Sequence, residues 1–212
     1  MCYRTEGDIE ATKIAKYWEK RLAEGYKGQP AKEFNGFAYP ELPVSTCEEP
    51  DLIQPMRWGL IPAWVKDETQ AQEMQSHTLN AVGETIFDKP SFRSILRKRC
   101  LIYVTGFYEW QLAGKSKIKY LLKVRDMPSF ALGGLYETWI NRKTEIPYTG
   151  FSIITCRANE LMAKIHNTKK RMPFILNDKE KAAEWLADLS KEEIKMQLKP
   201  FPEERMEALQ QS

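Results

Sequence analysis

A cysteine stands second in the chain, directly after Met1, and this position suits it to aldehyde chemistry. Cysteine is small enough for the initiator methionine to be removed, which would place an α-amine and a thiol on adjacent carbons of Cys2. The amine has a pKa of about 7.7 to 8, so part of it is neutral at pH 7. Such an amine condenses with an aldehyde to an imine, and the thiol then closes a five-membered thiazolidine. The alternative is a buried structural cysteine, which burial statistics favour for a lone Cys2.

A carboxylate lies inside an aromatic segment, Gly-Phe-Tyr-Glu-Trp at residues 106–110. Strand alternation puts Glu109 on the same side as Phe107 and opposite to Tyr108 and Trp110. Apolar rings raise the pKa of a neighbouring carboxyl group and nearby cations lower it, so Glu109 is suited to moving protons. A surface salt bridge is the alternative.

One of the two histidines, His166, stands at the end of a predicted helix and precedes a run of cations. Lys169, Lys170 and Arg171 are consecutive in the sequence. Their positive charges lower the pKa of His166 and favour its neutral, basic form, and the same cations can contact phosphates. A solvated basic loop is the alternative.

Two tryptophans, Trp58 and Trp64, flank a predicted turn, and Arg57 stands beside the first. Exposed indoles would stack on nucleobases, each stack contributing about 1 to 3 kcal/mol. Buried indoles would belong to the core, which is the commoner position of tryptophan. Further along, Asn80 and Glu84 are polar residues close to a glycine, where turn or capping roles are usual.

The net charge is only +3, yet the charges are unevenly distributed. Residues 89–125 contain ten Lys or Arg and a single acid, Glu109, whereas residues 178–207 contain nine acids and six bases. A local positive surface on a nearly neutral chain predicts a face for a polyanion, with a solvated basic strand surface as an equally weighted alternative.

The composition predicts one compact domain over residues 1–212. The chain has 42% hydrophobic residues, no linker-like segment and no repeat, and its apolar runs are far shorter than the roughly 20 residues of a membrane span. We therefore expect a cytoplasmic protein without membrane association. The four cysteines are about fifty residues apart, which predicts free thiols and neither a metal site nor a cofactor: Cys2, Cys47, Cys100 and Cys156.

Short alternating runs bounded by turn residues predict a mainly antiparallel α+β fold. A helix is expected from Asp8, its cap, to about Glu24, and two more at Ala158–Ile165 and Asp178–Leu189, with Trp185 and Leu186 buried. Residues 61–92 are expected to be loop with short helical turns. The predicted strands are Leu42–Thr46, Ile53–Trp58, Arg99–Thr105, Phe107–Leu112, Tyr120–Arg125, Phe130–Trp139 and Phe151–Cys156.

The order of these segments resembles the SOS-response-associated peptidase (SRAP) family, whose members shield abasic sites in single-stranded DNA. The resemblance runs from Cys2 to about Leu176 and covers most of the chain. Each motif is short, but together they are specific. They are an initial Met-Cys, Trp-Gly-Leu-Ile-Pro-x-Trp, Leu-Asn-Ala-x-x-Glu-Thr, Gly-Phe-Tyr-Glu-Trp and Ile-His-x-x-x-x-Arg-Met-Pro.

The resemblance implies a role for each matching residue. Cys2 matches the nucleophile that forms a thiazolidine with the ring-opened abasic sugar, and Asn80 matches the side chain that holds the reacting centre. Glu109 matches the proton-relaying acid, and His166 the acid/base near the sugar oxygen. Trp58 and Trp64 resemble aromatic residues beside the DNA, with DNA-contacting cations expected at Arg4, Arg57, Lys169, Lys170 and Arg171.

The resemblance also implies a curved, mainly antiparallel sheet around a positively charged groove, with abasic single-stranded DNA as the partner. Replication-fork proteins and, on DNA, the nucleoid are further expected associations. The chain departs from the common family pattern at Tyr3 and Val82, where Gly and Arg are usual, and in the spacing from His166 to Arg171. Without an arginine–phosphate interaction at position 82, the salt dependence of binding is predicted to be weaker by about 0.7 in log–log slope.

Three functions therefore remain open. The first is covalent capture of abasic sites, a lyase-like DNA–protein crosslinking reaction through Cys2. The second is cysteine-type peptidase activity, including autoproteolytic removal of Met1, with His166 or Glu109 as the base. The third is a binding module that recognises single strands without forming a covalent bond.

Overall fold

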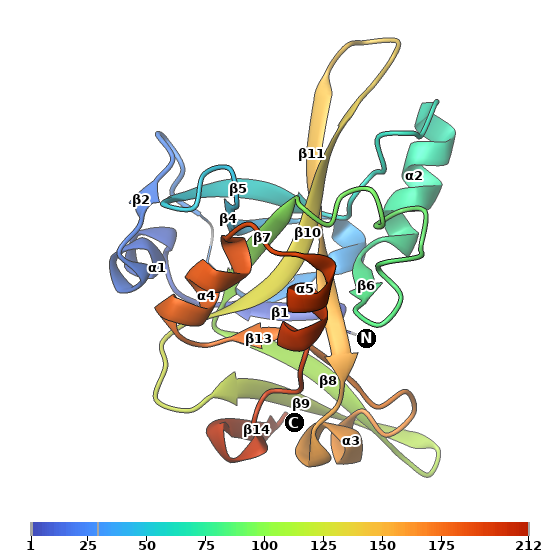
Figure 1. Cartoon of the computed structure of the whole chain (residues 1–212). Coiled ribbons are helices and arrows are strands. Elements are labelled where there is room, and N and C mark those ends of the chain that lie inside the picture. The colour runs from blue at the N-terminus through green and yellow to red at the C-terminus, as the bar shows by residue number, and fades with distance from the viewer. Residues whose placement is uncertain (1, 29, 212) are drawn as a thin grey trace.

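The computed structural model describes residues 2–28 and 30–211, which fold into a compact α+β domain of mostly antiparallel strands and short helices (Figure 1). This confirms the predicted fold class. The helices are α1 (Ala11–Trp18), α2 (Glu68–His77), α3 (Glu160–Ile165), α4 (Lys179–Leu186) and α5 (Lys191–Gln197), with 3-10 turns η1 (Gly36–Ala38) and η2 (Glu203–Arg205). The strands are β1 (Arg4–Gly7), β2 (Arg21–Leu22), β3 (Ala31–Asn35), β4 (Glu41–Thr46), β5 (Leu52–Trp58), β6 (Asn80–Val82), β7 (Arg99–Val104), β8 (Gly106–Ala113), β9 (Ser116–Val124), β10 (Phe130–Ile140), β11 (Pro147–Arg157), β12 (Arg171–Pro173), β13 (Ile175–Leu176) and β14 (Met206–Gln210).

The strands form two sheets. The first has five strands in the order β14-β9-β8-β1-β3. In the second, the order is β12-β11-β10-β7-β4-β5-β2, and a parallel pairing of β5 with β11 closes the path into a ring. Strand β6 runs parallel to β11, on the edge of this ring, and β13 pairs with β10. The curvature that the family resemblance implied is thus achieved by a sheet that closes on itself.

Two buried clusters fill the molecule. One lies between the two sheets, where Phe107 and Leu122 of the five-stranded sheet join Val44 and Ile102 of the ring, and it includes Cys2. The other packs the ring against α1 and α4, as Figure 1 shows for the helices on that side. Each Å² of apolar surface that is buried stabilises the fold by about 25 cal/mol. Burial in these clusters therefore holds the two sheets in place around Cys2.

The first helix is shorter than predicted. It ends at Trp18 because Glu19 adopts a left-handed backbone conformation with φ 55°. Residues Arg21–Leu22 then form strand β2 against β5, although the helical spacing of apolar residues continues to Leu22. Asp8 does not cap this helix, whose N-cap is Glu10 without a side-chain hydrogen bond.

Residues 61–92 contain more regular structure than predicted. Helix α2 begins after Asp67, whose side chain accepts a hydrogen bond from the amide of Gln70 at 2.9 Å. Only Ala71 and Gln75 of this helix are buried, so it lacks the apolar stripe that reveals a helix in sequence. The short strand β6 follows it and carries Asn80.

The later helices agree better with the prediction. Asp178 caps α4 by accepting a hydrogen bond from the amide of Lys181 at 2.7 Å, and Trp185 and Leu186 are buried. Apart from α2, the elements that the sequence did not predict are short: β1, β2, β3, β6, β12, β13, α5 and β14.

Candidate functional site

The predicted nucleophile, Cys2, is fully buried at the edge of the core between the sheets. Its backbone carbonyl accepts a hydrogen bond from the Asn80 side chain at 2.8 Å, and its thiol lies 3.8 Å from the carbonyl oxygen of Arg4. Burial raises the pKa of the Cys2 thiol far above its ordinary value, and the negative charge of Glu109 raises it further. The thiol is therefore protonated at neutral pH.

Asn80 reaches Cys2 because β6 is held on both sides. Residues 80 to 82 pair in parallel with β11, with Asn80 opposite Ile153. The preceding carbonyl, that of Leu79, accepts a hydrogen bond from the buried indole of Trp58 at 2.9 Å. The amide oxygen Oδ1 of Asn80 is buried and has no hydrogen-bond partner among the described residues. Asn80 thus combines a donor already used on Cys2 with an acceptor that a ligand could satisfy.

Glu109 lies on β8, the middle strand of the five-stranded sheet, between β1 and β9. The antiparallel register pairs Thr5 with Phe107, and its continuation places residue 3 opposite Glu109, one residue from Cys2. The Glu109 side chain is buried, and this burial raises the pKa of its carboxyl group to about 7, although the Trp110 amide opposes the shift. Of the two opposing effects expected from the sequence, apolar surroundings and nearby cations, the raising effect of burial is the larger.

His166 stands directly after α3, as predicted, and is 7% exposed. Its Nδ1 lies 2.9 Å from the carbonyl oxygen and 3.3 Å from the amide nitrogen of Arg171. Burial lowers the pKa of His166, and the positive charges of Lys169 and Arg171 lower it further, so the imidazole is neutral at pH 7.

The loop that carries His166 is fastened to the strand that carries Glu109. The side chain of Asn167 accepts from the Leu112 amide at 3.1 Å and donates to the Leu112 carbonyl at 2.9 Å. Gln111 adds a hydrogen bond to the carbonyl of Lys164 at 3.0 Å. The structure therefore links Cys2 to Asn80 directly and joins the Glu109 and His166 segments through β8.

The chemical capacity of this cluster follows from its protonation states. It holds a neutral thiol, a carboxyl group with a pKa of about 7 and a neutral imidazole. A carboxyl group with that pKa can both accept and donate a proton near neutral pH. The cluster can therefore activate a thiol and move the protons of an addition to a carbonyl compound.

Four of the predicted DNA-contacting residues are accessible. Lys169 and Lys170 are exposed in the loop after His166. Trp64 is 44% exposed, and Arg57 is exposed above the Tyr148 ring, with its guanidinium carbon 5.7 Å from the ring centre. These side chains can meet a polyanion without rearrangement of the core.

Three other predicted DNA contacts are buried or already engaged by other residues of the protein. Trp58 is fully buried and stacks on Phe151 with ring centres 6.2 Å apart, so its prediction as a base-stacking residue is wrong. The guanidinium of Arg171 is turned away from solvent, because both of its terminal nitrogens donate hydrogen bonds to the Glu84 carboxylate. Arg4 forms an ion pair with Glu33.

Two features of the site were not predicted from the sequence. The Glu84–Arg171 ion pair joins residues separated by 87 positions, for which no local pattern exists. Tyr3 packs on Phe37 with ring centres 5.0 Å apart, and Phe37 is 54% exposed beside the Cys2 segment. The sequence signal for the Tyr3–Phe37 pair is weak: an aromatic residue, Phe37, that follows a glycine, Gly36, in a turn.

Comparisons with known proteins identify the family of this chain. The SOS response associated peptidase (SRAP) family model matches residues 1–212. The chain belongs to the SRAP family. Its motifs around Cys2, Asn80, Glu109 and His166 are those that carry the resemblance, and the structure brings the first three together around one thiol.

Relatives and solved structures of the SRAP chain extend the match. Abasic site processing protein YoqW of Bacillus subtilis is 43% identical over 161 residues, which is 74% of this chain and 68% of that protein. Abasic site processing protein HMCES of Gallus gallus is 31% identical over 64% of this chain, but the match covers 45% of that protein. A crystal structure of a Bacteroides thetaiotaomicron protein superimposes with a TM-score of 0.89 at 39% identity, over 99% of this chain and 91% of its own.

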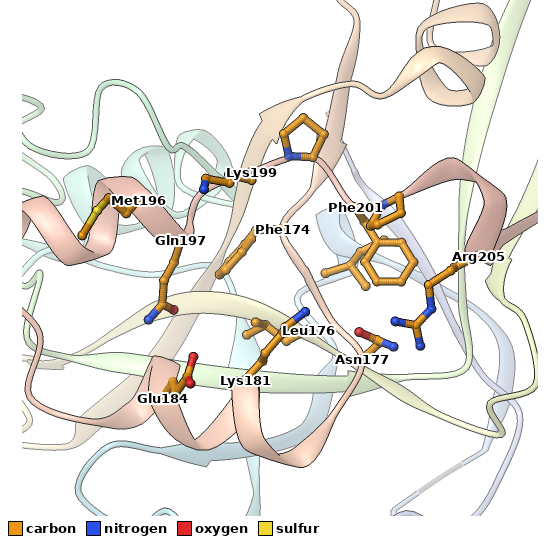
Figure 2. A pocket seen from close by; sticks show the side chains of 13 residues that line it. Phe174, Leu176, Asn177, Lys181, Glu184, Met196, Gln197, Lys199, Phe201 and Arg205 are labelled. Carbon is orange, nitrogen blue, oxygen red and sulfur yellow. The ribbon is translucent and has the colours of Figure 1, made fainter.

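This SRAP-family structure also has a separate cavity of about 380 Å³ between α4, α5 and β13 (Figure 2). Its floor is apolar, and the charged ends of Lys181, Glu184 and Arg205 stand around it. Among residues 2–28 and 30–211, no group of three or more His, Cys, Asp or Glu could hold a metal ion, and no helix is long and apolar enough to cross a membrane.

Proposed function

We propose that this SRAP-family chain binds single-stranded DNA and captures abasic sites covalently through Cys2. The observation that carries the proposal is the contact of Asn80 with the Cys2 carbonyl at 2.8 Å, in a segment where the nearby Glu109 carboxyl has a pKa of about 7. The names of YoqW and HMCES, both abasic site processing proteins, support the same substrate. An abasic site supplies the required aldehyde when its sugar ring opens.

The reaction uses both nucleophiles of Cys2 and is complete without a cofactor. Once Met1 is absent, the α-amine adds to the sugar aldehyde and expels one water, which forms an imine. The Cys2 sulfur then adds to the imine carbon, its proton passes to the imine nitrogen, and a thiazolidine ring results. No oxidant or reductant is needed, because one C–N and one C–S bond replace the carbonyl bonds.

Glu109 and His166 move the protons of this sequence. The buried thiol is protonated, so ring closure requires a base, and an ionised Glu109 can serve near pH 7. A neutral His166 can take or return a proton at the sugar oxygen during ring opening and during reversal. General acid–base help of this kind typically contributes about 10² to 10⁴ in rate.

The exposed cations and rings supply the DNA contacts in this proposal. Lys169, Lys170 and Arg57 meet phosphates along a positively charged groove, and Trp64 stacks on a base. Association with replication-fork proteins and with the nucleoid stays a prediction.

A denaturing gel tests the proposal directly. The native chain is expected to give a heat-stable adduct with an abasic single strand and none with the intact strand, and Cys2→Ala is expected to give no adduct. Cys47→Ala is the matched control, because Cys47 is also a free cysteine but its thiol donates to the carbonyl of Arg97. Normal crosslinking by Cys2→Ala would refute the mechanism, and equal non-covalent binding of both strands by the native chain would favour a simple binding module.

Self-removal of Met1 is a second proposal, supported by the peptidase name of the family and by a potential base, Glu109, near the thiol. Mass spectrometry of the chain made in cells with inhibited methionine aminopeptidase tests it. A chain beginning at Cys2 there supports autoproteolysis, and retention of Met1 contradicts it.

A further inference from the structure

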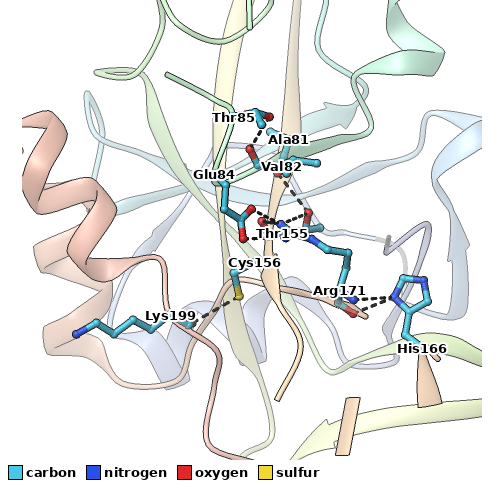
Figure 3. Close-up of polar contacts among 9 residues, drawn as sticks. All are labelled: Ala81, Val82, Glu84, Thr85, Thr155, Cys156, His166, Arg171 and Lys199. Atoms are coloured by element: carbon cyan, nitrogen blue, oxygen red, sulfur yellow. Dashed lines mark hydrogen bonds and ion pairs between the residues drawn. The ribbon is translucent and has the colours of Figure 1, made fainter. Parts of the chain in front are cut away.

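The side chain of Arg171 crosses three neighbouring strands. Arg171 begins β12, which pairs with β11, and β11 pairs in turn with β6 on its other side. The guanidinium passes over β11, donates to the carbonyl of Thr155 at 2.5 Å, and reaches both carboxylate oxygens of Glu84 at 2.8 and 2.7 Å (Figure 3). Glu84 lies just beyond the strand that carries Asn80. The ion pair therefore fastens the Asn80 segment to the His166 segment.

The backbone of the same arginine holds the catalytic imidazole. The Arg171 carbonyl lies 2.9 Å from His166 Nδ1, while the Arg171 amide lies farther away at 3.3 Å (Figure 3). The shorter contact selects a proton on Nδ1, because a carbonyl oxygen can only accept. In the neutral ring, Nε2 then carries the lone pair that can accept a proton from a substrate.

We propose that the Glu84–Arg171 ion pair is a positioning device for His166: it fixes the backbone of Arg171, and this backbone sets the orientation and tautomer of the imidazole. The inference rests on the function proposed above and deepens it. Arg171 thereby acts as a positioning residue, and the phosphate contact expected of it passes to its exposed neighbours Lys169 and Lys170.

The geometry favours positioning over a purely electrostatic role. A bidentate arginine–carboxylate pair is directional, and the Arg171 side chain is only 14% exposed, so the pair is shielded from solvent on one side. Lys170, the preceding residue, has a left-handed backbone with φ 50°, which gives the loop a shape that needs an anchor on each side. Helix α3 anchors one side, and the ion pair anchors the other.

Kinetics of adduct formation test the device through Glu84→Gln, a substitution at a side chain that is 42% exposed and can fold as the native residue does. The rate is expected to fall about ten- to a hundred-fold, because misplacing a catalytic group by about 1 Å can cost that much. The rate of Arg171→Lys, which keeps the positive charge but loses the two-pronged guanidinium, is expected to fall similarly. Glu19→Gln is the matched control: it removes the exposed Glu19–Lys179 pair and is expected to leave the rate unchanged.

A double-mutant cycle separates positioning from general destabilisation. In a His166→Ala background, Glu84→Gln is expected to change the remaining rate less than twofold, since the group it positions is gone. An equal fall in both backgrounds, or a native-like rate for Glu84→Gln alone, would overturn the inference.

Nitrogen NMR of the imidazoles gives a readout that requires no DNA. His166 is expected as the Nδ1–H tautomer in the native chain and as a tautomer mixture in Glu84→Gln, with His77, the other histidine, as internal reference. An unchanged His166 spectrum in Glu84→Gln would overturn the inference even if the rate falls. If the native chain itself forms no adduct, the proposed function fails, while this spectrum still decides the role of the ion pair.

Discussion

The Cys2 cluster and the cavity between α4 and α5 are opposite kinds of site. The cavity is open, holds about 380 Å³ and is surrounded by exposed charged side chains (Figure 2). The cluster consists of a thiol, a carboxyl group and an imidazole that are all buried and whose pKa values are shifted by that burial. We expect the chemistry at these desolvated groups, because shifted pKa values of this kind suit proton transfer.

Burial of three titratable groups costs stability. The fold tolerates this cost because the surrounding elements hold each group in place. Cys2, just before β1, lies beside Asn80 of β6 and near Glu109 of β8, and the loop that carries His166 is hydrogen-bonded to β8, so each group is held by a different element. The cavity is lined mainly by one continuous C-terminal region. Substitutions in the cluster should therefore change the rate of the chemistry most, and substitutions around the cavity should change it least.

Glu109→Gln is expected to lower the rate of adduct formation about 10²- to 10⁴-fold, because it removes the base for the thiol. The native rate should rise between pH 6 and pH 8 as Glu109 ionises around its pKa of about 7 and the amine loses its proton. The variant should keep only the amine's dependence, with a midpoint near about 8. Single-turnover gels across this pH range measure both curves, and coincident curves would contradict the role of Glu109.

Asn80→Ala is expected to slow adduct formation about tenfold, because it removes the hydrogen bond to the Cys2 carbonyl, a contribution of about 1 to 1.5 kcal/mol. Asn167→Ala is an informative comparison, since Asn167 ties the His166 loop to Leu112 without touching Cys2. Rates at saturating DNA distinguish positioning of Cys2 from DNA affinity. A native rate for Asn80→Ala would show that this contact is only structural.

Glu109→Gln is also expected to change stability with pH. The folded pKa of about 7 is raised above the ordinary 4.5, so the group stabilises the fold fully below pH 4.5 and this contribution is lost as pH rises to about 7. A shift of this size corresponds to about 3 kcal/mol at most. The Tm of the variant relative to the native chain should therefore rise by several degrees from pH 4 to pH 8. A constant difference across that range would mean that Glu109 is not buried as a carboxyl group.

The accessible residues should affect affinity and not chemistry. Lys169→Ala with Lys170→Ala is expected to weaken single-strand binding and to reduce its log–log salt slope by about 0.7 for each phosphate interaction that is removed. Trp64→Ala is expected to weaken binding several-fold with the slope unchanged, because a stacked ring carries no charge. Binding isotherms at several salt concentrations check both, and a reduced slope for Trp64→Ala would contradict the stacking role.

Substitutions around the cavity should leave the rate of adduct formation unchanged. Lys181→Ala removes one of its surrounding charges, and the rate of adduct formation is expected to stay within about twofold of native, as for most surface substitutions. A larger loss would show that the two regions are coupled and would remove the distinction between them.

The sequence predicted the family and the fold class better than the contacts. Cys2 and Glu109 were recognisable because a terminal thiol and an isolated acid in an aromatic strand are unusual on their own, and burial does shift the Glu109 pKa upward. The α+β class followed from alternating strands. Helix α4 followed from a cap at Asp178, with Trp185 and Leu186 expected on its buried side.

The failures share a physical cause, which is that tertiary contacts decide them. Burial was already the commoner alternative for Trp58, but the contact that buries it against Phe151 depends on the meeting of β5 with β11. Arg171 looked like a phosphate contact because its partner, Glu84, lies 87 positions away. Helix α2 stayed hidden because it buries only two residues, and the C-terminal end of α1 because a left-handed residue, Glu19, overrides an apolar spacing that continues past it.

The chemical state of Cys2 in the adduct tests the central claim most directly. The gel-purified adduct is treated with iodoacetamide, digested and sequenced by tandem mass spectrometry. The account predicts a peptide that begins at Cys2, carries the sugar with the loss of one water, and has a sulfur that resists alkylation. A sugar on a peptide that retains Met1, on another residue, or beside an alkylated Cys2 thiol would contradict it.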